Sequence, residues 1–182
     1  IKSYPRSDKI QEASFLGAKS YYMLSPRYSL DQTETDKALL KLQTFINNYS
    51  ESEYFEEANT MAGELTTKKE KKEIEIAKQF NKLGEFNLPI LISAITALDN
   101  FITDNPGSVY REEALFYRIE AATRLALNST EERKQERLED ALESYNTLMR
   151  YFPETEFKKK ADGYAETIRE ELSAYNTTSL SK

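Results

Sequence analysis

The side chains of this sequence best suited to acid–base chemistry are adjacent carboxylates, such as Glu112 with Glu113 and Glu131 with Glu132. Neighbouring residues on a helix point about 100° apart, so such pairs do not converge on one reacting atom. The chain has no histidine and no cysteine, which removes the commonest general base, thiolate nucleophiles and the usual zinc ligands. We therefore predict a non-catalytic protein without cofactor or metal, although the composition leaves a carboxylate metal site open.

Aromatic and cationic residues gather in one short stretch, where Tyr21, Tyr22, Arg27 and Tyr28 fall at the end of a predicted helix and in the loop after it. Aromatic faces beside a guanidinium group would bind an extended, aromatic-ended peptide by stacking and carboxylate pairing. The alternative is structural: the tyrosines pack against an adjacent repeat, and Arg27 is solvated or pairs with Asp31.

A mixed charge run lies further along the chain, and its basic members are Lys68, Lys69, Lys71 and Lys72. On the rim of an interface such lysines would speed encounter with an acidic partner. The alternative is a solvated helix surface carrying i,i+4 pairs such as Glu64 with Lys68, each worth only about 0.2–0.5 kcal/mol.

A second cationic and aromatic group near the end of the chain contains Arg133, Arg137, Arg150, Tyr145 and Tyr151. Partner docking is one interpretation of this group. Core packing by Tyr145 is the other, because aromatic residues at repeat positions usually stack the helices.

The elements that hold these residues repeat. Each repeat has an aromatic or polar residue, a proline or serine, a spacer and a serine or threonine, with an alanine eight residues past the proline position. The copies begin at Tyr4, Tyr49, Asn105 and Phe152, and their alanines are Ala13, Ala58, Ala114 and Ala161. Proline disfavours helix for the residue before it, and the hydroxyl can cap the next helix, so each copy predicts a corner between two helices.

Helical spacing ahead of the last three corners predicts core positions, namely Ala38, Leu42, Phe45, Ala94, Leu98, Phe101, Ala141, Tyr145 and Leu148. The fold class predicted is all-α, a tetratricopeptide-like solenoid of about seven helices at 7–24, 34–49, 53–83, 88–105, 108–127, 131–152 and 154–175. The helix at 53–83 is unusually long. The corners are farther apart than a 34-residue period, and we assign the excess to 25–34, to that helix with its turn, and to 128–137.

Domain organisation follows from this pattern: residues 1–175 form one repeat array, truncated at its N-terminus, and residues 176–182 form a flexible tail. The net charge of -6 arises from 31 acidic and 25 basic residues that are interspersed, which argues against nucleic-acid binding. No apolar run approaches the roughly 20 residues of a membrane span, and no signal peptide opens the chain. We expect any targeting signal to lie upstream.

The stretch from Ala18 to Thr33 reads Ala-Lys-Ser-Tyr-Tyr-Met-Leu-Ser-Pro-Arg-Tyr-Ser-Leu-Asp-Gln-Thr. With the Tyr-Pro-x-Ser type corners and the segment from Asn128 to Arg137, it resembles the BamD family of outer-membrane assembly lipoproteins, in the form found in Bacteroidetes. The resemblance covers essentially the whole chain, without the family's lipidated N-terminus and first repeat. Ser50 stands where the family pattern has proline, and Asn105 where it has an aromatic residue.

The resemblance implies a non-catalytic scaffold at the periplasmic face of the outer membrane, held there by a lipid upstream of this chain. Its implied partners are the POTRA region of a BamA-like barrel-inserting protein and unfolded outer-membrane proteins. Client binding would fall to Tyr21, Tyr22, Arg27 and Tyr28. Partner binding would fall to Lys68, Lys69, Lys71, Lys72, Arg133 and Arg137.

Two rival functions remain open at the level of sequence. One is another periplasmic tetratricopeptide adaptor of the Tol-Pal or cell-division coordinator type, since such proteins use nearly the same corner sequences. The other is a helical carbohydrate-binding or hydrolytic protein, which would need a carboxylate-lined pocket that the sequence does not indicate.

Overall fold

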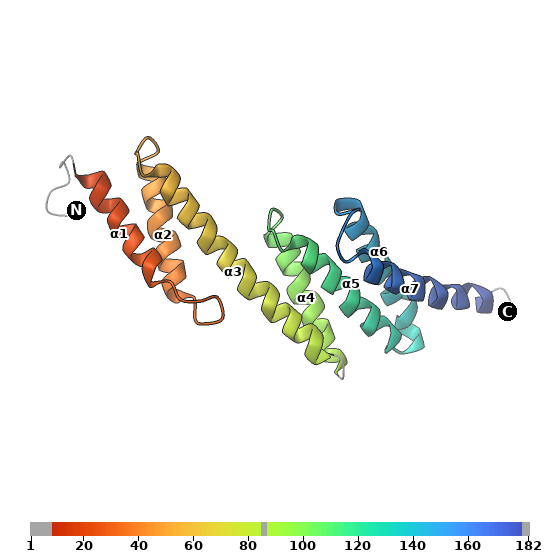
Figure 1. The fold of residues 1–182 in the computed structure, drawn as a ribbon. Helices are drawn as coiled ribbons and strands as arrows, with labels where there is room; N and C mark the ends of the chain where they lie inside the picture. The colour runs from red at the N-terminus through yellow and green to blue at the C-terminus, as the bar shows by residue number, and fades with distance from the viewer. Residues whose placement is uncertain (1–8, 85–86, 180–182) are drawn as a thin grey trace. The chain divides into compact units, whose positions relative to one another are not determined.

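The computed structural model describes residues 9–84 and 87–179, and in these ranges seven α-helices follow one another without a strand (Figure 1). The helices are α1 (Ile10–Leu24), α2 (Thr33–Asn48), α3 (Phe55–Leu83), α4 (Leu88–Asp104), α5 (Arg111–Leu127), α6 (Glu131–Tyr151) and α7 (Lys158–Ser179). The predicted all-α fold class, including the long third helix, is confirmed. Each boundary lies within four residues of its predicted place, and α7 continues past residue 175.

The corners between helices use their hydroxyl groups differently from our prediction. Each serine or threonine accepts a backbone N–H two residues later, and the next helix begins three residues after it. The hydroxyl therefore stabilises the turn before the helix, and the predicted capping of the helix itself was wrong. The bonds join Ser52 to Tyr54 (3.3 Å), Ser108 to Tyr110 (3.1 Å) and Thr155 to Phe157 (3.2 Å). The corner at Tyr4 lies outside the described residues.

The chain divides into two compact units, Ile1–Lys72 and Glu73–Lys182, and α3 contributes residues to both. In the first unit, α1, α2 and the start of α3 share one core, in which Phe15 stacks on Tyr54 with ring centroids 4.7 Å apart. The buried residues of this core are Phe15, Ala18, Ala38, Leu42, Phe45, Ala58, Met61 and Leu65. Ala13, the alanine of the first repeat copy, is exposed.

The second unit buries the same repeat positions. The side chains of Ala94, Ala114, Ala141 and Ala161 are fully buried, which lets neighbouring helices approach closely. Leu98, Phe101 and Leu148 are buried as predicted. Tyr145 is half-buried against the core, and its hydroxyl donates to Asp162 Oδ1 at 2.7 Å, which favours the packing interpretation of this residue.

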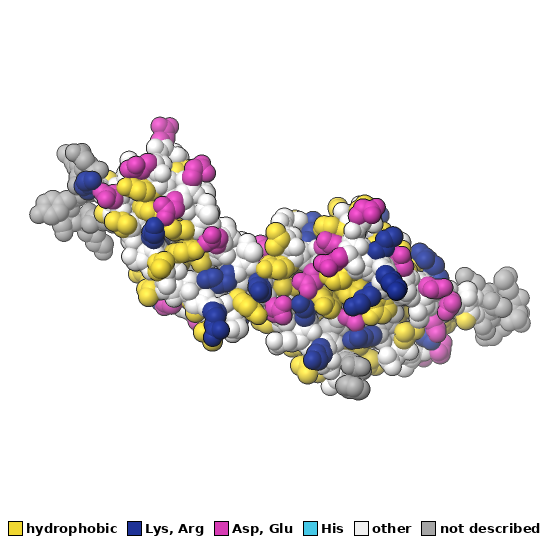
Figure 2. All heavy atoms as spheres, viewed as in Figure 1, with side chains coloured by type: hydrophobic (Ala, Val, Ile, Leu, Met, Phe, Trp, Pro, Cys, Tyr) yellow, Lys and Arg dark blue, Asp and Glu magenta, His cyan; other side chains and the backbone are white. Residues whose placement is uncertain are grey.

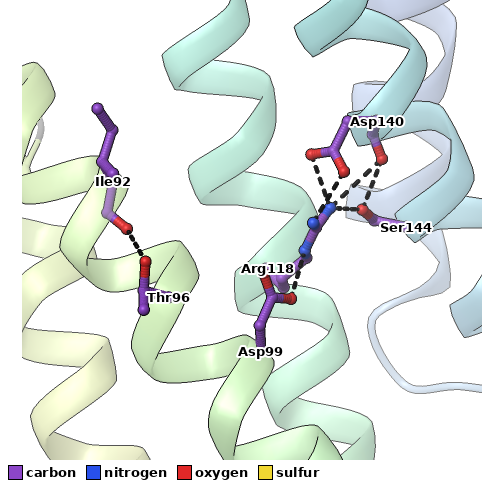
Figure 3. Close-up of polar contacts among 6 residues, drawn as sticks. All are labelled: Ile92, Thr96, Asp99, Arg118, Asp140 and Ser144. Carbon is purple, nitrogen blue, oxygen red and sulfur yellow. Dashed lines mark hydrogen bonds and ion pairs between the residues drawn. The ribbon is translucent and has the colours of Figure 1, made fainter.

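A buried arginine joins three helices of the second unit (Figure 3). Arg118 on α5 has a side chain only 14% exposed; its Nε donates to Asp99 on α4 at 2.9 Å, and its two terminal nitrogens donate to the Asp140 carboxylate on α6 at 2.9 Å each. The guanidinium group also contacts the Ser144 hydroxyl. Burial opposes the charge, but the hydrogen bonds with Asp140 and Asp99 outweigh it and raise the pKa of Arg118.

Two further helix contacts in this unit pair a phenol with a carboxylate. The Tyr164 hydroxyl on α7 donates to Glu120 on α5 at 2.9 Å, and the Tyr175 hydroxyl donates to Glu131 on α6 at 2.6 Å. Burial together with the charge of Glu120 raises the pKa of Tyr164 to about 12. The hydrogen bond to Glu131 raises the pKa of Tyr175. Both phenols therefore stay protonated, and so remain donors, at neutral pH.

The close packing of Gly84, just after α3, gives a first prediction. A Cβ atom at this position would lie 2.6 Å from Cδ2 and 3.0 Å from the backbone nitrogen of Leu91, a buried residue of α4. We expect Gly84→Ala to lower the free energy of unfolding by about 1–3 kcal/mol in urea denaturation, because the added methyl group overpacks this junction. Gly163→Ala in α7 is the control, since a Cβ there meets no atom within 4 Å, and it is expected to raise stability by about 0.5–1 kcal/mol. Equal stability of the two variants would contradict the prediction.

Candidate functional site

The loop between α1 and α2, residues 25–32, carries two of the predicted client-binding residues and is held from inside by a buried amide. The Gln32 side chain is 8% exposed, and its Nε2 donates to the carbonyl oxygens of Arg27 and Leu30 at 2.9 Å each. The Thr35 hydroxyl donates to Gln32 Oε1 at 2.8 Å and so fixes the amide in turn. One side chain thereby satisfies backbone carbonyls that a loop otherwise leaves to water.

Two lysines of α3 also hold this loop. Lys68 Nζ donates to Ser25 Oγ at 2.6 Å and to the Pro26 carbonyl oxygen at 3.2 Å, while Lys72 Nζ donates to the Leu30 carbonyl oxygen at 2.8 Å. Burial lowers the pKa of Lys68. The contacts of Lys68 and Lys72 all lie within the first unit, so the loop and this part of α3 form one fixed structure.

The other two lysines of the run contact side chains. Lys71 Nζ lies 4.7 Å from the centroid of the Tyr28 ring, a cation–π geometry, and Lys69 forms an ion pair of 2.7 Å with Asp36 on α2. The structure thus brings the predicted partner-binding lysines and the predicted client-binding loop together. We call residues 25–32 with Lys68, Lys71 and Lys72 the loop site.

The remaining predicted client-binding residues take different positions. The Tyr22 hydroxyl donates to the Glu64 carboxylate on α3, and this hydrogen bond raises the pKa of Tyr22. Tyr21 faces another way and lies 5.9 Å from Lys41 Nζ on α2. Arg27 is exposed, as in the alternative in which it is solvated. The Thr33 backbone N–H donates to Asp31 Oδ1 at 2.9 Å, and hydrogen bonding with Thr33, through its side chain first and its backbone second, lowers the pKa of Asp31. Of the four residues, Arg27 and Tyr28 belong to the loop site.

Beside Tyr21 lies a groove of about 440 Å³ between α1 and α2. Its lining is mixed, and the residues are Ser14, Gly17, Ala18, Tyr21, Lys41, Thr44, Phe45, Asn48 and Tyr49. The groove is of the size that takes a short peptide or small ligand. Tyr21 is therefore positioned in a binding-sized groove of its own, apart from the loop site.

Exposed apolar residues around the loop were missed at the level of sequence. Met23 and Leu24 end α1 with exposed fractions of 72% and 64%, and Leu30 in the loop is 53% exposed. Leu16 is exposed seven residues before Met23, on the same side of α1. Leu16 and Met23 fall at helical positions different from those of the buried Phe15 and Ala18. This difference was the signal in the sequence that could have predicted their exposure. A fixed backbone with exposed apolar side chains beside the exposed Arg27 suits an extended peptide.

The second predicted cationic group does not form one surface patch. Arg137 donates to Ser129 Oγ at 2.6 Å near the start of α6, where Arg133 is exposed. Tyr151 is exposed and lies 4.9 Å from the Arg111 guanidinium carbon. Arg150 is exposed on α6. Arg133 and Arg150 are thus the members most accessible to a partner.

A further apolar stripe lies on the last part of α3, within the second unit. Ile76, Phe80 and Leu83 are 40%, 38% and 61% exposed, and their spacing of four and three residues places them on one side of the helix. The spacing of these three apolar residues could have predicted the stripe from the sequence. The prediction used only the repeated core positions and therefore missed it.

Charge does not gather into a basic stripe on the face shown in Figure 2, where Lys and Arg side chains alternate with Asp and Glu. Among the described residues, no group of three or more acidic side chains is arranged to hold a metal ion. No described helix has both the length and the apolar character needed to cross a membrane.

The contacts of Gln32 give a second prediction. We expect Gln32→Ala to release the loop, because the carbonyl oxygens of Arg27 and Leu30 lose their shared donor. Amide hydrogen exchange of residues 25–32 is expected to accelerate about tenfold or more, since two hydrogen bonds contribute about 1–3 kcal/mol together. Gln43→Ala on the exposed side of α2 is the matched control and leaves this exchange unchanged. Unaltered exchange in Gln32→Ala would show that the α3 lysines hold the loop alone.

Comparison with known proteins gives two findings. Residues 1–88 and 89–179 each match the family described as YfiO, outer membrane lipoprotein. A curated relative, the outer membrane protein assembly factor BamD of Caulobacter vibrioides, is 26% identical over 133 residues, which is 73% of this chain and 42% of the relative. The chain thus spans less than half the length of that relative.

Proposed function

Because the chain belongs to the YfiO family of outer membrane lipoproteins, we propose that it is a scaffold subunit of the machinery that assembles β-barrel proteins in the outer membrane. The observation that carries this proposal is the family match, which extends from residue 1 to residue 179 in two successive stretches. The role is non-catalytic, as in the assembly factors of this family. The similarity to an assembly factor of Caulobacter vibrioides supports the same role.

The proposed location is the periplasmic face of the outer membrane, with a lipid anchor upstream of these residues. The proposed partner is the POTRA region of a BamA-like protein. Arg133, Arg137 and the four lysines of α3 remain our candidates for this contact. Because Lys68 and Lys72 bond to the loop backbone, we expect these two to act by holding the loop, and Lys69 and Lys71 to be the more available to a partner.

The proposed clients are unfolded outer-membrane proteins, which would meet the loop site and the groove beside Tyr21. Arg27 supplies an exposed cation for a carboxylate, Tyr28 supplies an aromatic face, and Leu30 adds exposed apolar surface. The Ala18 to Thr33 stretch that forms this region is also what supports our proposal of the Bacteroidetes type.

The test is affinity capture from detergent-solubilised envelope of the bacterium that encodes the intact protein. Wild type is compared with Lys69→Glu/Lys71→Glu, which leaves the loop's backbone bonds in place, and with Lys159→Glu/Lys160→Glu, an equal charge change on the exposed start of α7. We expect wild type and the α7 variant to recover the BamA-like protein and the α3 variant to lose it.

A second arm measures crosslinking of an outer-membrane protein diluted from urea, with Arg27→Glu against the control Lys160→Glu, both at exposed basic residues. We expect only Arg27→Glu to weaken crosslinking. Recovery of the BamA-like protein with every variant would keep the scaffold role and remove the lysines from it. Recovery of division or Tol-Pal proteins instead would favour the adaptor function.

A further inference from the structure

Of the three methionines in this chain, Met23 at the end of α1 is the one that solvent reaches freely. Its exposed fraction is 72%, whereas Met61, in the core of the first unit, is 7% exposed. Met149 is half-buried against the core of the second unit, and its sulfur accepts a hydrogen bond from Lys158 Nζ at 3.7 Å. A small oxidant dissolved in water therefore meets the thioether of Met23 before the other two.

The repeat gives the position of Met23 to charged side chains in the other helices. Met23 lies ten residues after the repeated alanine of its helix, and the residues at the same distance from Ala58, Ala114 and Ala161 are Lys68, Arg124 and Glu171. Arg124 pairs with Glu120 at 2.8 Å and Glu171 with Lys134 at 2.6 Å, and the two side chains are 33% and 38% exposed. The position thus stays accessible even in helices whose repeated alanine is fully buried, and burial does not account for an apolar residue there.

Met23 lies beside the loop site, among exposed apolar side chains. Leu24 follows it in the chain and Leu30 lies in the loop, and both are exposed. Methionine is unbranched, flexible and polarizable, so it adapts its shape to different apolar partners. Unlike the two leucines, its thioether is converted by an oxidant into a polar group.

We propose that Met23 is a modification site, at which a peroxide converts the thioether to the sulfoxide and thereby weakens apolar contacts beside the loop site. The sulfur attacks one oxygen atom of hydrogen peroxide. An S–O bond forms, the O–O bond breaks, the sulfur gives up two electrons, and the second oxygen leaves with both protons as water. The consequence for clients rests on the proposed function, whereas the place of oxidation does not.

The first test is exposure of the folded 182-residue chain to hydrogen peroxide, followed by mass spectrometry of its proteolytic peptides. We expect the first oxygen atom to be taken up at Met23, and Met61 and Met149 to react at a comparable rate only after unfolding in urea. Met149→Leu is the matched control and leaves the rate at Met23 unchanged. Equal rates at the three methionines of the folded chain would overturn the proposal.

The second test measures crosslinking of an outer-membrane protein diluted from urea, before and after the chain is oxidised, with the peroxide removed before the client is added. We expect oxidation to weaken crosslinking about fourfold, the effect of withdrawing the apolar contact of about one methylene group. Treatment with methionine sulfoxide reductases is expected to restore it, because the sulfoxide is reduced back to the thioether.

Two variants at the same exposed position assign the effect to Met23. Met23→Leu keeps an apolar side chain that peroxide does not oxidise, so its crosslinking is expected to be the same before and after treatment. Met23→Gln carries a polar side chain of similar length and is expected to crosslink as weakly as the oxidised wild type, without any peroxide. An equal response of wild type and Met23→Leu to peroxide would overturn the assignment.

Failure of this proposal is distinguishable from failure of the client function. Undiminished crosslinking by a chain oxidised at Met23 would overturn the effect of the modification and leave the client function intact. Absence of crosslinking with the reduced wild type would overturn the client function and, with it, the effect on clients. The peptide masses decide the place of oxidation in either case.

Discussion

Replacing Phe116 by alanine is expected to lower the free energy of unfolding of the second unit by about 3–5 kcal/mol, the usual cost of removing a buried aromatic ring. Phe116 is 3% exposed, and its ring stacks on Phe157 with centroids 4.5 Å apart and contacts Tyr117 at 5.4 Å. Phe157 lies in the corner before α7, so the cavity would open where three segments meet.

The measurement is urea denaturation followed by far-UV circular dichroism, with Val109→Ala as the control. Val109 is 74% exposed, and its replacement is expected to change stability by less than about 0.5 kcal/mol. Phe116→Leu fills part of the cavity and is expected to recover part of the loss. A loss below about 1 kcal/mol in Phe116→Ala would show that the surrounding residues collapse into the space.

Arg118→Ala is expected to cost about 2–3 kcal/mol. Removing one partner of a fully buried ion pair costs about 3–5 kcal/mol, but Asp99 and Asp140 are 48% and 49% exposed and regain water when the arginine is lost, which reduces the cost. Arg118→Lys keeps the charge but cannot donate to both oxygens of Asp140, so its expected loss is intermediate.

Thermal and urea unfolding at low and high salt would check this expectation, with exposed Arg133→Ala as the control. The contribution of Arg118 to the stability of the wild type is expected to persist at high salt, because the ion pairs of a side chain that is only 14% exposed are weakly screened. A cost in Arg118→Ala that vanishes at 0.5 M salt would indicate an ordinary surface pair instead.

The repeated alanines made the fold predictable from sequence. Ala38, Ala94 and Ala141 recur at one offset from the corners, and each is fully buried. Burial at such a position follows from helical spacing and from the close approach of two helices, and both can be predicted from a sequence. The serine or threonine at each corner could also be recognised in the sequence as a turn residue. The backbone N–H that donates to its hydroxyl could not be predicted, because turns and helix caps use the same residue types within three positions of each other.

The candidate site was less predictable, because its contacts join residues far apart in the chain. Lys68 was visible as one lysine in a charged run, yet its bond to the Pro26 carbonyl oxygen spans 42 residues. Asn81 gave no signal at all, since the partner of its buried amide, Glu120 on α5, lies 39 residues further along the chain. Spacing predicts which face of a helix is buried; it does not predict which single polar group a lysine or amide will meet.

The pairing of phenols with carboxylates has a consequence for the conditions in which the helices stay together. Salt ions weaken the attraction between two exposed charges beyond a Debye length of about 10 Å at 0.1 M, but they act little on a neutral hydroxyl in direct contact with an oxygen. The links from Tyr164 to Glu120 and from Tyr175 to Glu131, at 2.9 Å and 2.6 Å, are of this second kind. These two links of α7 are therefore expected to change little with ionic strength, unlike the ion pair of Lys134 with Glu171, which is a useful property wherever the ionic strength follows the medium outside the cell.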